Sequence, residues 1–588
     1  MTFPYGISDF YKLITEGYLY LDRTDRIRLV EEAGSQLLFL RPRRFGKSLW
    51  LSTLENYYDV AKADEFERLF GHLTIGQRPT ALHNRYFILR WDFSVVDPQG
   101  EIRHIRRSLY NHINAAIERF AWRYQDLLPH PIERDDDDAL RSFQSLLAVI
   151  QQTPYRLYLL IDEYDNFANE VLMAGRERYE ALLSGEGLLK TLFKAVKSAS
   201  SGLGLDRVFI TGVSPVVLSD VTSGYNIAED VSLHPRFDDL CGFTEAEIAG
   251  VLHQIAALCG FSANRTDEAL TMMRTFYNGY RFSLEQEAPV YNPTLALYFF
   301  KNWQRDCRYP RQMLDSNLAM DRAKIAYIAR LPHGEQVILD ALSEERPLRL
   351  SALSDRFGVE EMLTAAKGTD FMISLLYYFG VLTLAEPSPF GEMVFRIPNL
   401  VVRRLYAEQF REQLLPRFQD EGRRAARRLF QRGEIGPLCR FVERRYFPVL
   451  ANRDYRWANE LTVKTAFLTL LFDDVFYVID SEAALERKYA DLALIVRPDM
   501  RRYRLLDILI EFKYIALQDL GLSGEQVQNL SAEEIWNLGM VQSRLQEATA
   551  QLQTYRHAVE ARYGEALRLR TYAVIALGFE RLVCSPIG

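Results

Sequence analysis

The chain has 588 residues, five cysteines and a formal net charge of −7, and 48% of its residues are hydrophobic. This length predicts three or four domains with cores of their own, and the negative charge means that any contact with nucleic acid has to be local. The apolar runs are too short to cross a bilayer and the cysteines form no C-x-x-C pair, so a membrane span, a zinc site and a disulfide framework are not expected. The start of the chain shows no signal peptide, and the cytoplasm is the expected compartment.

A candidate phosphate-binding loop lies near the start of the chain. Residues 36–40 form an apolar run that predicts a buried strand, and residues 49–58 predict a helix. Between them stands Arg-Pro-Arg-Arg-Phe-Gly-Lys-Ser, residues 41–48. A strand, a loop with Gly-Lys-Ser and a helix are the setting of a nucleotide-binding P-loop. Backbone N–H groups and the helix N-terminus would hold phosphate oxygens, Lys47 would reach the terminal phosphates, and Ser48 would ligate Mg²⁺.

The loop departs from the G-x-x-x-x-G-K-S pattern in two places. Arg41 stands where the first glycine is expected, and Pro42 has no N–H to offer to a phosphate. We still expect this loop to bind the nucleotide. The residues assigned to that contact are Arg44, Phe45, Gly46, Lys47 and Ser48.

Two further strands are predicted to bring polar groups to the same site. Residues 156–161 form a near-continuous apolar strand that ends in Asp162 and Glu163. Asp162 would hold the metal, and Glu163 would orient the attacking water. Residues 207–214 form another strand that ends in small hydroxyl residues, and Ser214 would lie near the γ-phosphate. Each could be a core strand that ends in a loop, but together they predict a doubly wound parallel sheet with its ligand at the strand ends.

The middle of the chain has the pattern of a winged helix. Residues 334–342, 350–357 and 371–379 predict three short helices. Residues 381–384 and 393–397 predict a two-stranded wing.

A long helical stretch is expected over residues 400–432. It carries a basic stripe, which we define as Arg423, Arg424, Arg427 and Arg428. Residues four apart share one face of a helix. The stripe is either an ordinary solvated face or a contact for the phosphate backbone of a nucleic acid.

Near the end of the chain, two apolar runs predict a β-hairpin. The runs are residues 492–496 and 505–510, and a turn signal, Arg-Pro-Asp, follows the first. A hairpin centred between them would place Asp491 opposite Glu511. Because side chains alternate along a strand, Glu511 and Lys513 share one face.

Two carboxylates and an ammonium group at one place suit a metal-dependent phosphodiesterase. Carboxylates are natural ligands of Mg²⁺, which also takes oxygens from a phosphate. A metal held by Asp491 and Glu511 would polarise a phosphodiester and activate water, with Lys513 steadying the developing charge. The same spacing is compatible with a hairpin that carries charges on a solvated face.

These residues resemble the PD-(D/E)XK nuclease superfamily, and more closely its branch fused to an ATPase-like domain in bacterial proteins. The resemblance implies that Glu460, on a helix that reaches residue 471, is a further metal ligand. Glu486 matches an acidic residue that precedes the aspartate, and Gln551 matches a glutamine on a later helix. The chain departs from the family at residues 489–490, where Tyr-Ala stands in place of Gly-Arg or a similar pair.

The front half resembles the AAA-ATPase-like domain found fused to these nucleases. The matching motifs are residues 41–48, 161–165, 211–215, 277–281 and 291–293. In that family the loop itself reads Arg-Pro-Arg-Arg-Phe-Gly-Lys, so the missing glycine is a family trait. The resemblance implies that Arg281 lies in a small helical lid and touches the phosphates. It also implies that Arg236 acts as a finger supplied by a neighbouring copy in a homo-oligomer, although a surface arginine without a ligand is the other interpretation of both.

We therefore expect a cytoplasmic α/β multidomain protein. Residues 1–310 are predicted to form a P-loop AAA-like parallel-sheet domain with a helical lid, residues 311–445 a winged-helix-like and helical linker domain, and residues 446–588 a PD-(D/E)XK nuclease α/β domain. The expected function is ATP-regulated cleavage of nucleic acid, with DNA as the expected substrate, ATP and Mg²⁺ as cofactors, and Mn²⁺ as an alternative metal at the nuclease site. The alternative is a nucleotide-switched binding or signalling protein with a vestigial nuclease, in defence against foreign DNA or in a mobile element.

Overall fold

The computed structural model shows two compact units, and each is described by itself. Unit 1 comprises Met1–Gln304, Arg330–His333 and Arg349–Pro398, and unit 2 comprises Arg305–Ala329, Gly334–Leu348 and Asn399–Gly588. The domain boundaries at residues 310 and 445 stay predictions. The described residues are 1–99, 101–166, 188–215, 227–286, 288–314, 322–343, 347–354, 368–414, 418–452, 460–480, 491–564 and 567–587. Within these ranges, no helix combines the length and the apolar character needed to cross a membrane.

The centre of unit 1 is a parallel sheet of five strands in the order β2-β3-β4-β1-β5. The strands are β1 (Gln36–Leu40), β2 (Tyr86–Asp92), β3 (Arg156–Asp162), β4 (Leu205–Gly212) and β5 (Glu229–Asp230). β1, β3 and β4 are buried along nearly their whole length, as expected of parallel strands covered on both faces. The predicted doubly wound parallel sheet is confirmed, and β4 lies between the strand that leads into the phosphate-binding loop and the strand that ends in Asp162.

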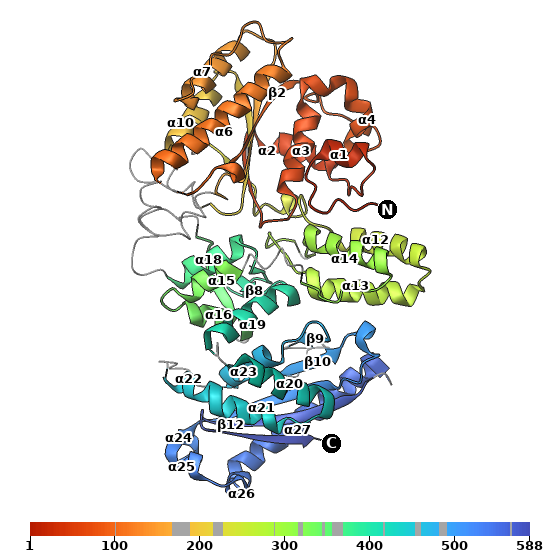
Figure 1. Cartoon of the computed structure of the whole chain (residues 1–588), viewed down its shortest axis with the longest axis vertical. Coiled ribbons are helices and arrows are strands. Elements are labelled where there is room, and N and C mark those ends of the chain that lie inside the picture. Colours follow the sequence, from red (N-terminus) through yellow and green to blue (C-terminus); the bar gives the residue numbers. More distant parts are fainter. Residues whose placement is uncertain are drawn as a thin grey trace. The chain divides into compact units, whose positions relative to one another are not determined.

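Helices cover both faces of this sheet. On one side lie α6 (Ile102–Arg123), α7 (Ala139–Ile150) and α10 (Leu188–Ser200), and on the other lie α2 (Ile27–Ala33) and α3 (Lys47–Tyr58) (Figure 1). Shorter helices of the same region are α1 (Phe10–Thr15), α4 (Phe66–Phe70) and α5 (Thr74–Gln77). Where the helical lid is predicted, the structure has α12 (Glu245–Cys259), α13 (Ala263–Tyr277) and α14 (Pro293–Asp306).

A small sheet and α18 (Thr369–Tyr378) complete unit 1. The sheet has the order β6-β8-β7, and its strands are β6 (Leu348–Leu350), β7 (Thr383–Leu384) and β8 (Met393–Arg396). β7 and β8 are antiparallel, so the strand pair predicted there is confirmed. The helix predicted over residues 350–357 is wrong in its described part: residue 350 ends a strand with alternating burial, and residues 351–354 are not helical. Its remainder lies outside the described residues.

Unit 2 is built on a second sheet of five strands, in the order β13-β12-β11-β10-β9. The strands are β9 (Tyr477–Asp480), β10 (Leu492–Val496), β11 (Asp507–Ile515), β12 (Leu569–Leu577) and β13 (Arg581–Ile587). β11 and β12 run parallel, and the other neighbouring pairs are antiparallel. Leu492 pairs with Ile510, which confirms the predicted hairpin and its register.

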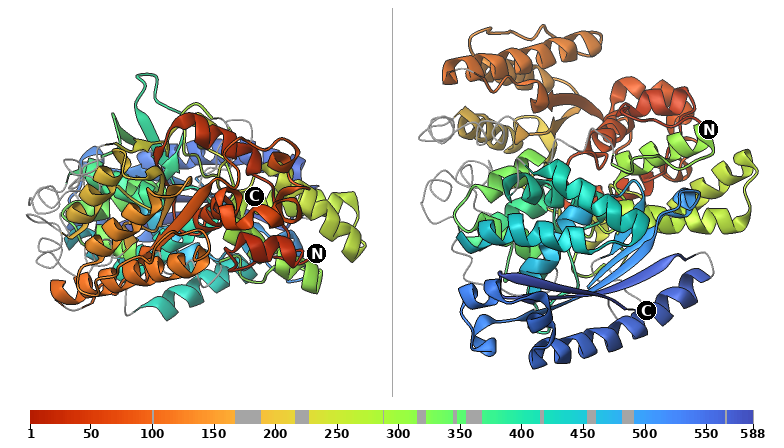
Figure 2. Two further views of the ribbon diagram at one scale, coloured as in Figure 1. Left: turned by 90° about the horizontal axis from the view of Figure 1, so that it is seen from above. Right: turned by 60° about the horizontal axis from the view of Figure 1, so that its bottom comes forward.

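Helices cover both faces of the second sheet as well. Figure 2 (right) shows α27 (Gly539–Tyr563) along one face, and α20 (Gln419–Arg432), α21 (Gly436–Phe441) and α23 (Glu460–Leu471) over the other. The further helices of the unit are α15 (Arg322–Ala329), α16 (Gly334–Ser343), α19 (Leu400–Leu414), α22 (Phe447–Asn452), α24 (Leu517–Leu520), α25 (Gly524–Asn529) and α26 (Ala532–Trp536). Leu552 of α27 packs on β10 and β11, and Phe467 of α23 meets Phe512 with ring centroids 5.1 Å apart.

The helical stretch expected over residues 400–432 consists of two helices, α19 and α20. Residues 415–417 lie outside the described residues, and the sequence at this point contains Pro416, a residue that breaks helices. The basic stripe lies on α20, where all four arginines are exposed while Ala425, Ala426 and Leu429 are buried.

Candidate functional site

The candidate nucleotide site lies at the carboxyl end of β1. The phosphate-binding loop follows Leu40, and α3 begins at Lys47. Gly46 has a φ of 99°, which a glycine adopts without strain, and it turns the loop into α3. Nζ of Lys47 donates to the carbonyl oxygens of Arg41 at 2.9 Å and Pro42 at 3.0 Å, and burial lowers the pKa of Lys47. A phosphate would have to replace these carbonyls as the partner of the ammonium group.

Asp162, at the end of β3, has a partner for each carboxylate oxygen. Its Oδ1 accepts from the hydroxyl of Thr211 at 2.8 Å, and its Oδ2 accepts from Nη2 of Arg90 at 3.0 Å. Thr211 comes from β4 and Arg90 from β2, so three adjacent strands meet at this carboxylate. Neither partner was assigned a role from the sequence. Arg90 could have been noticed, because an arginine inside the apolar run of β2 indicates a charged group that needs a partner.

Glu163 follows with a strained backbone. Its φ of 48° lies in the left-handed region, which is uncommon for a residue with a side chain and concentrates at functional sites. Burial raises the pKa of Glu163, and the charge of Lys47 opposes that shift. The predicted pair of Asp162 and Glu163 is therefore brought to the same place as Lys47.

Ser214 is held by the segment that follows β3. Its hydroxyl and its backbone N–H both donate to Oδ2 of Asp165 at 2.8 Å. Tyr164 donates its hydroxyl to the carbonyl oxygen of Ser214 at 2.6 Å, and the N–H of Val213 donates to Asp165 Oδ1 at 3.0 Å. Asp165 thus fixes the chain beyond β4, and contact of Ser214 with a γ-phosphate stays a prediction.

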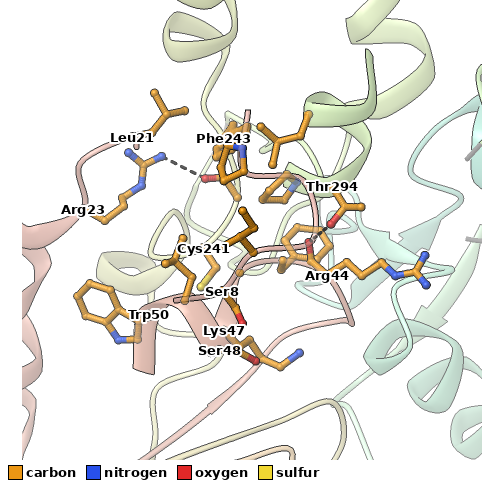
Figure 3. Close-up of a pocket in the computed structure, with 18 of the residues that line it drawn as sticks. Ser8, Leu21, Arg23, Arg44, Lys47, Ser48, Trp50, Cys241, Phe243 and Thr294 are labelled. Atoms are coloured by element: carbon orange, nitrogen blue, oxygen red, sulfur yellow. Dashed lines mark hydrogen bonds between the residues drawn. The ribbon is translucent and has the colours of Figure 1, made fainter. Parts of the chain in front are cut away.

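A cavity of about 280 Å³ opens beside the loop. Lys47, Ser48 and Glu163 line it, together with an apolar wall that includes Leu19, Tyr20, Leu21, Trp50, Leu240, Phe243 and Leu297. Figure 3 shows residues that line the cavity, among them Ser8, Trp50 and Cys241, with Arg44 extending away from Lys47 and Ser48. A concave site with a charged end and an apolar wall is suited to a ligand with both kinds of group.

The loop also packs against the segment that follows α13. The ring of Phe45 lies 4.9 Å from that of Tyr280 and 5.3 Å from that of Phe282, edge to face in both pairs. Between them, the backbone N–H of Arg281 donates to the hydroxyl of Thr383 at 2.7 Å. Arg281 is buried and does not line the cavity, so its phosphate contact stays a prediction.

Arg236 forms an exposed ion pair with Glu32 at 2.7 Å. Its role as an arginine finger stays a prediction.

A second site lies at the start of the hairpin in unit 2. We call it the acid–lysine cluster and define it as Glu460, Asp491, Glu511 and Lys513. Oε2 of Glu511 lies 3.5 Å from the backbone nitrogen of Asp491, and Nζ of Lys513 donates to Glu511 Oε1 at 3.0 Å. Oε2 of Glu460, at the start of α23, accepts from the N–H of Tyr514 at 3.2 Å. The hairpin register thus brings Asp491, Glu511 and Lys513 together, and the helix places Glu460 at the backbone of the residue next to Lys513.

These charges do not lie on a solvated face. Glu511 is 3% exposed and Lys513 is 9% exposed. Burial, and then the charge of Asp491, raise the pKa of Glu511 to about 7, while Lys513 opposes the shift. Burial alone would lower the pKa of Lys513, but its acidic neighbours, Glu511 first, raise it. The alternative of an ordinary wet hairpin does not fit this burial.

α27 brings Tyr555 close to this cluster. Burial and the charges of Glu511 and Asp491 raise the pKa of Tyr555 to about 12. Gln551, one turn earlier, has a buried Oε1 without a hydrogen-bond partner among the described residues. Glu486, also noted from the sequence, lies outside the described residues.

Lys464 is a further residue of this site, for which no role was predicted from the sequence. It lies one turn after Glu460 on α23, and its Nζ is 3.5 Å from Oδ1 of Asp491. The i, i+4 spacing from Glu460 was the available signal.

In the part of the chain that the structure describes, no group of three or more His, Cys, Asp or Glu side chains is arranged to hold a metal ion. The pair of Asp491 and Glu511 is therefore the candidate, and a ligand role for Glu460 stays a prediction.

Unit 1 contains an ATPase domain of the P-loop kind. Three features define it: the order of the sheet, the loop before α3, and the meeting of Lys47 with Asp162 and Glu163. Residues 4–222 match the AAA-ATPase-like family, described as predicted AAA-ATPases. The chain is 26% identical over 421 residues to an uncharacterized protein in the vnfD 5' region of Azotobacter chroococcum mcd 1, which is 70% of each chain. The front part of the chain is accordingly similar to AAA-ATPase-like domains.

Solved structures give distant similarities. The Walker-type ATPase PABY2304 of Pyrococcus abyssi is 16% identical with a TM-score of 0.36, over 66% of this chain and 96% of that one. The Aeropyrum pernix ORC1 protein, solved in complex with DNA, is 12% identical with a TM-score of 0.25, over 69% and 98%. Cdc6p of Pyrobaculum aerophilum is 11% identical with a TM-score of 0.25, over 68% and 98%.

Proposed function

We propose that this chain is an ATP-regulated, metal-dependent nuclease that cleaves DNA. The observation that carries the proposal is the acid–lysine cluster, in which Glu511 and Lys513 are buried. Burying a charged group costs several kcal/mol per ion, and pairing with an opposite charge offsets this cost only in part. Residues with strongly shifted pKa values cluster at functional sites. A fold that only needed a hairpin here could have used apolar residues.

The donor set suits a hard divalent cation. Mg²⁺ is usually held by one or two carboxylates, with water and substrate phosphates completing its shell. Asp491 and Glu511 can supply those carboxylates, and Mn²⁺ could take the same place. When bound, such an ion would supply Lewis acidity and a bound water of lowered pKa. Lys513, beside Glu511, would place a positive charge where negative charge develops on the phosphate.

In unit 1, ATP with Mg²⁺ is the proposed ligand of the cavity and the loop. Lys47 would turn from its own loop carbonyls to the terminal phosphates, and Ser48 and Asp162 would offer oxygens to the metal. Glu163 would orient the attacking water. The segments of α18, β7 and β8 form a winged-helix-like element in this proposal, and the loop meets it through Tyr280, Arg281 and Phe282.

The basic stripe of α20 is the proposed DNA contact. The chain as a whole is negative, so a phosphate backbone needs a local positive surface. Four exposed arginines on one helix face provide one.

The proposal is tested by a cleavage assay with purified full-length protein, plasmid and linear DNA, and Mg²⁺ or Mn²⁺. We expect Asp491→Ala and Glu511→Ala to abolish cleavage, and Lys513→Ala to slow it by a factor on the order of 10² or more, the scale for losing one preorganised charge. EDTA should stop the reaction. Glu525→Ala removes an exposed carboxylate of the same unit and is the matched control. Cleavage that survives Asp491→Ala would point to a contaminant or another site.

A second candidate function is a nucleotide-switched binding or signalling protein with a vestigial nuclease. The observation that favours it is the engagement of Asp491, which faces Lys464 on one oxygen and accepts from the N–H of Phe512 on the other at 2.7 Å. ATP binding without cleavage under any metal would support this candidate.

A further inference from the structure

Lys464 is buried beside the same carboxylate that the proposed metal would need. Its side chain is only 3% exposed, and α23 is buried along almost its whole length. A buried ammonium group is stable when it is paired, and breaking such a pair is strongly destabilising. The helix therefore brings an amino group into the interior of the cluster, beside Asp491.

Asp491 is held from two directions. The backbone N–H of Phe512, on β11, donates to Oδ2 at 2.7 Å, and Nζ of Lys464 lies 3.5 Å from Oδ1. Glu511 has a lysine of its own, because Lys513 donates to it at 3.0 Å. Each of the two carboxylates that could hold a metal is thus paired with a separate lysine.

This pairing sets the charge that remains for metal ions. With every group ionised, Glu460, Asp491 and Glu511 bring three negative charges and the two lysines bring two positive ones. Glu547, whose Oε1 lies 3.9 Å from Nζ of Lys513, is offset by its own ion pair with Arg544 at 2.7 Å. The balance is one negative charge. Two divalent ions would meet strong mutual repulsion at such a centre.

The position of Lys464 matters as well as its charge. In centres with two metals, the ions lie about 3.5–4 Å apart and share ligands between them. The Nζ of Lys464 is 3.5 Å from Asp491 Oδ1, so any further cation that used this oxygen would lie close to the ammonium group.

We propose that Lys464 is a positioning residue that orients Asp491 and restricts the cluster to a single divalent ion. This inference rests on the proposed metal-dependent function of the same site. Lys464 acts through Asp491: its positive charge lies beside this carboxylate and repels a second divalent ion.

The test is a titration of full-length protein with Mn²⁺ alone, without nucleotide, in which free Mn²⁺ is followed by electron paramagnetic resonance. The parent should bind one ion that Asp491→Ala removes. Lys464→Met, with a similar shape and no charge, should bind a second ion at this site. It should also bind the first one more tightly by a factor on the order of 10, the effect of removing a nearby like charge even at the dielectric of water. Lys464→Arg keeps the charge and should retain one ion.

Two further variants keep the test decisive. Lys324→Met removes another buried lysine of unit 2, on α15, and should leave the Mn²⁺ titration unchanged. Lys464→Gln replaces Lys464→Met should the latter fail to fold, which circular dichroism would reveal. One ion at parental affinity in the uncharged variants would overturn the inference and leave the proposed function standing. A parent that binds no Asp491-dependent ion would overturn both.

Discussion

The contact between Gly380 and the phosphate-binding loop allows a test of how closely that loop depends on its surroundings. Gly380 has a φ of 75°, and a Cβ added there would lie 2.5 Å from Cβ and 2.6 Å from Cγ of Pro42. The carbonyl oxygen of Pro42 accepts from Nζ of Lys47 at 3.0 Å. A methyl group at residue 380 therefore presses on the loop at one of the two residues that hold Lys47.

The variant Gly380→Ala combines two costs. A left-handed backbone costs an L-residue roughly 1–2 kcal/mol, and an extra methyl group in a packed contact costs roughly 1–3 kcal/mol. The free energy of unfolding should fall by roughly 2–5 kcal/mol. Gly391→Ala is the matched control, since its φ is 78° and an added Cβ would have no atom within 4 Å. It should lose only the backbone cost of roughly 1–2 kcal/mol.

Urea unfolding measures these costs, and titration with a fluorescent ATP analogue in Mg²⁺ measures the state of the loop. Both variants should lose stability. Nucleotide affinity should fall only in Gly380→Ala, by roughly tenfold or more. A tenfold loss means that about 1.4 kcal/mol of the energy of the clash is expressed as weaker nucleotide binding. Equal nucleotide affinity in the two variants and the parent would refute the reasoning, because the loop would then be independent of residue 380.

Three further predictions concern ATP, DNA and pH. Lys47→Ala should weaken ATP binding in calorimetry because it removes the ammonium group from the terminal phosphates, whereas Glu163→Gln should keep binding and lose phosphate release. Changing the basic stripe to glutamines should weaken binding to all DNA sequences about equally and flatten its salt dependence, since fewer counterions are released; unchanged binding at every salt concentration would assign the stripe to a solvated face. His112 accepts from the N–H of Asp92 at 2.9 Å, and burial lowers its pKa from 6.5. The contribution of His112 to stability is therefore present above pH 6.5 and is lost as the pH falls through the lowered pKa. Unfolding curves measured above and below pH 6.5 should show this loss in the parent and not in His112→Gln.

Three residues of the acid–lysine cluster could be predicted because their geometry follows from local rules. A turn between two apolar runs fixes the register of a hairpin, and the alternation of side chains fixes which residues share a face. Asp491, Glu511 and Lys513 meet for these reasons, as the pairing of Leu492 with Ile510 shows. The parallel sheet of unit 1 was predictable for a similar reason, since continuous apolar runs that end in polar residues are typical of buried parallel strands.

The partners of these residues could not be predicted in the same way. Thr211 and Arg90 reach Asp162 only because β4 and β2 flank β3 in the folded sheet, and strand order is not written in any one strand. Lys464 reaches Asp491 only when α23 docks on the sheet that carries β10. Local spacing places a side chain on a face, but tertiary packing decides which charge it meets.

The departure of the phosphate-binding loop from its usual pattern has a tertiary explanation too. The guanidinium group of Arg41, in place of the expected glycine, points into the core and not toward the cavity. It donates to the carbonyl oxygens of Ser232 at 2.6 Å and Phe237 at 2.8 Å and stacks over the ring of Phe282 at 4.1 Å. Those buried carbonyls would lose their partner in a glycine-containing loop, at a cost of about 1–3 kcal/mol each. The arginine thus ties the start of the loop to the segments around it while its backbone carbonyl still serves Lys47, which explains why a glycine is not required here.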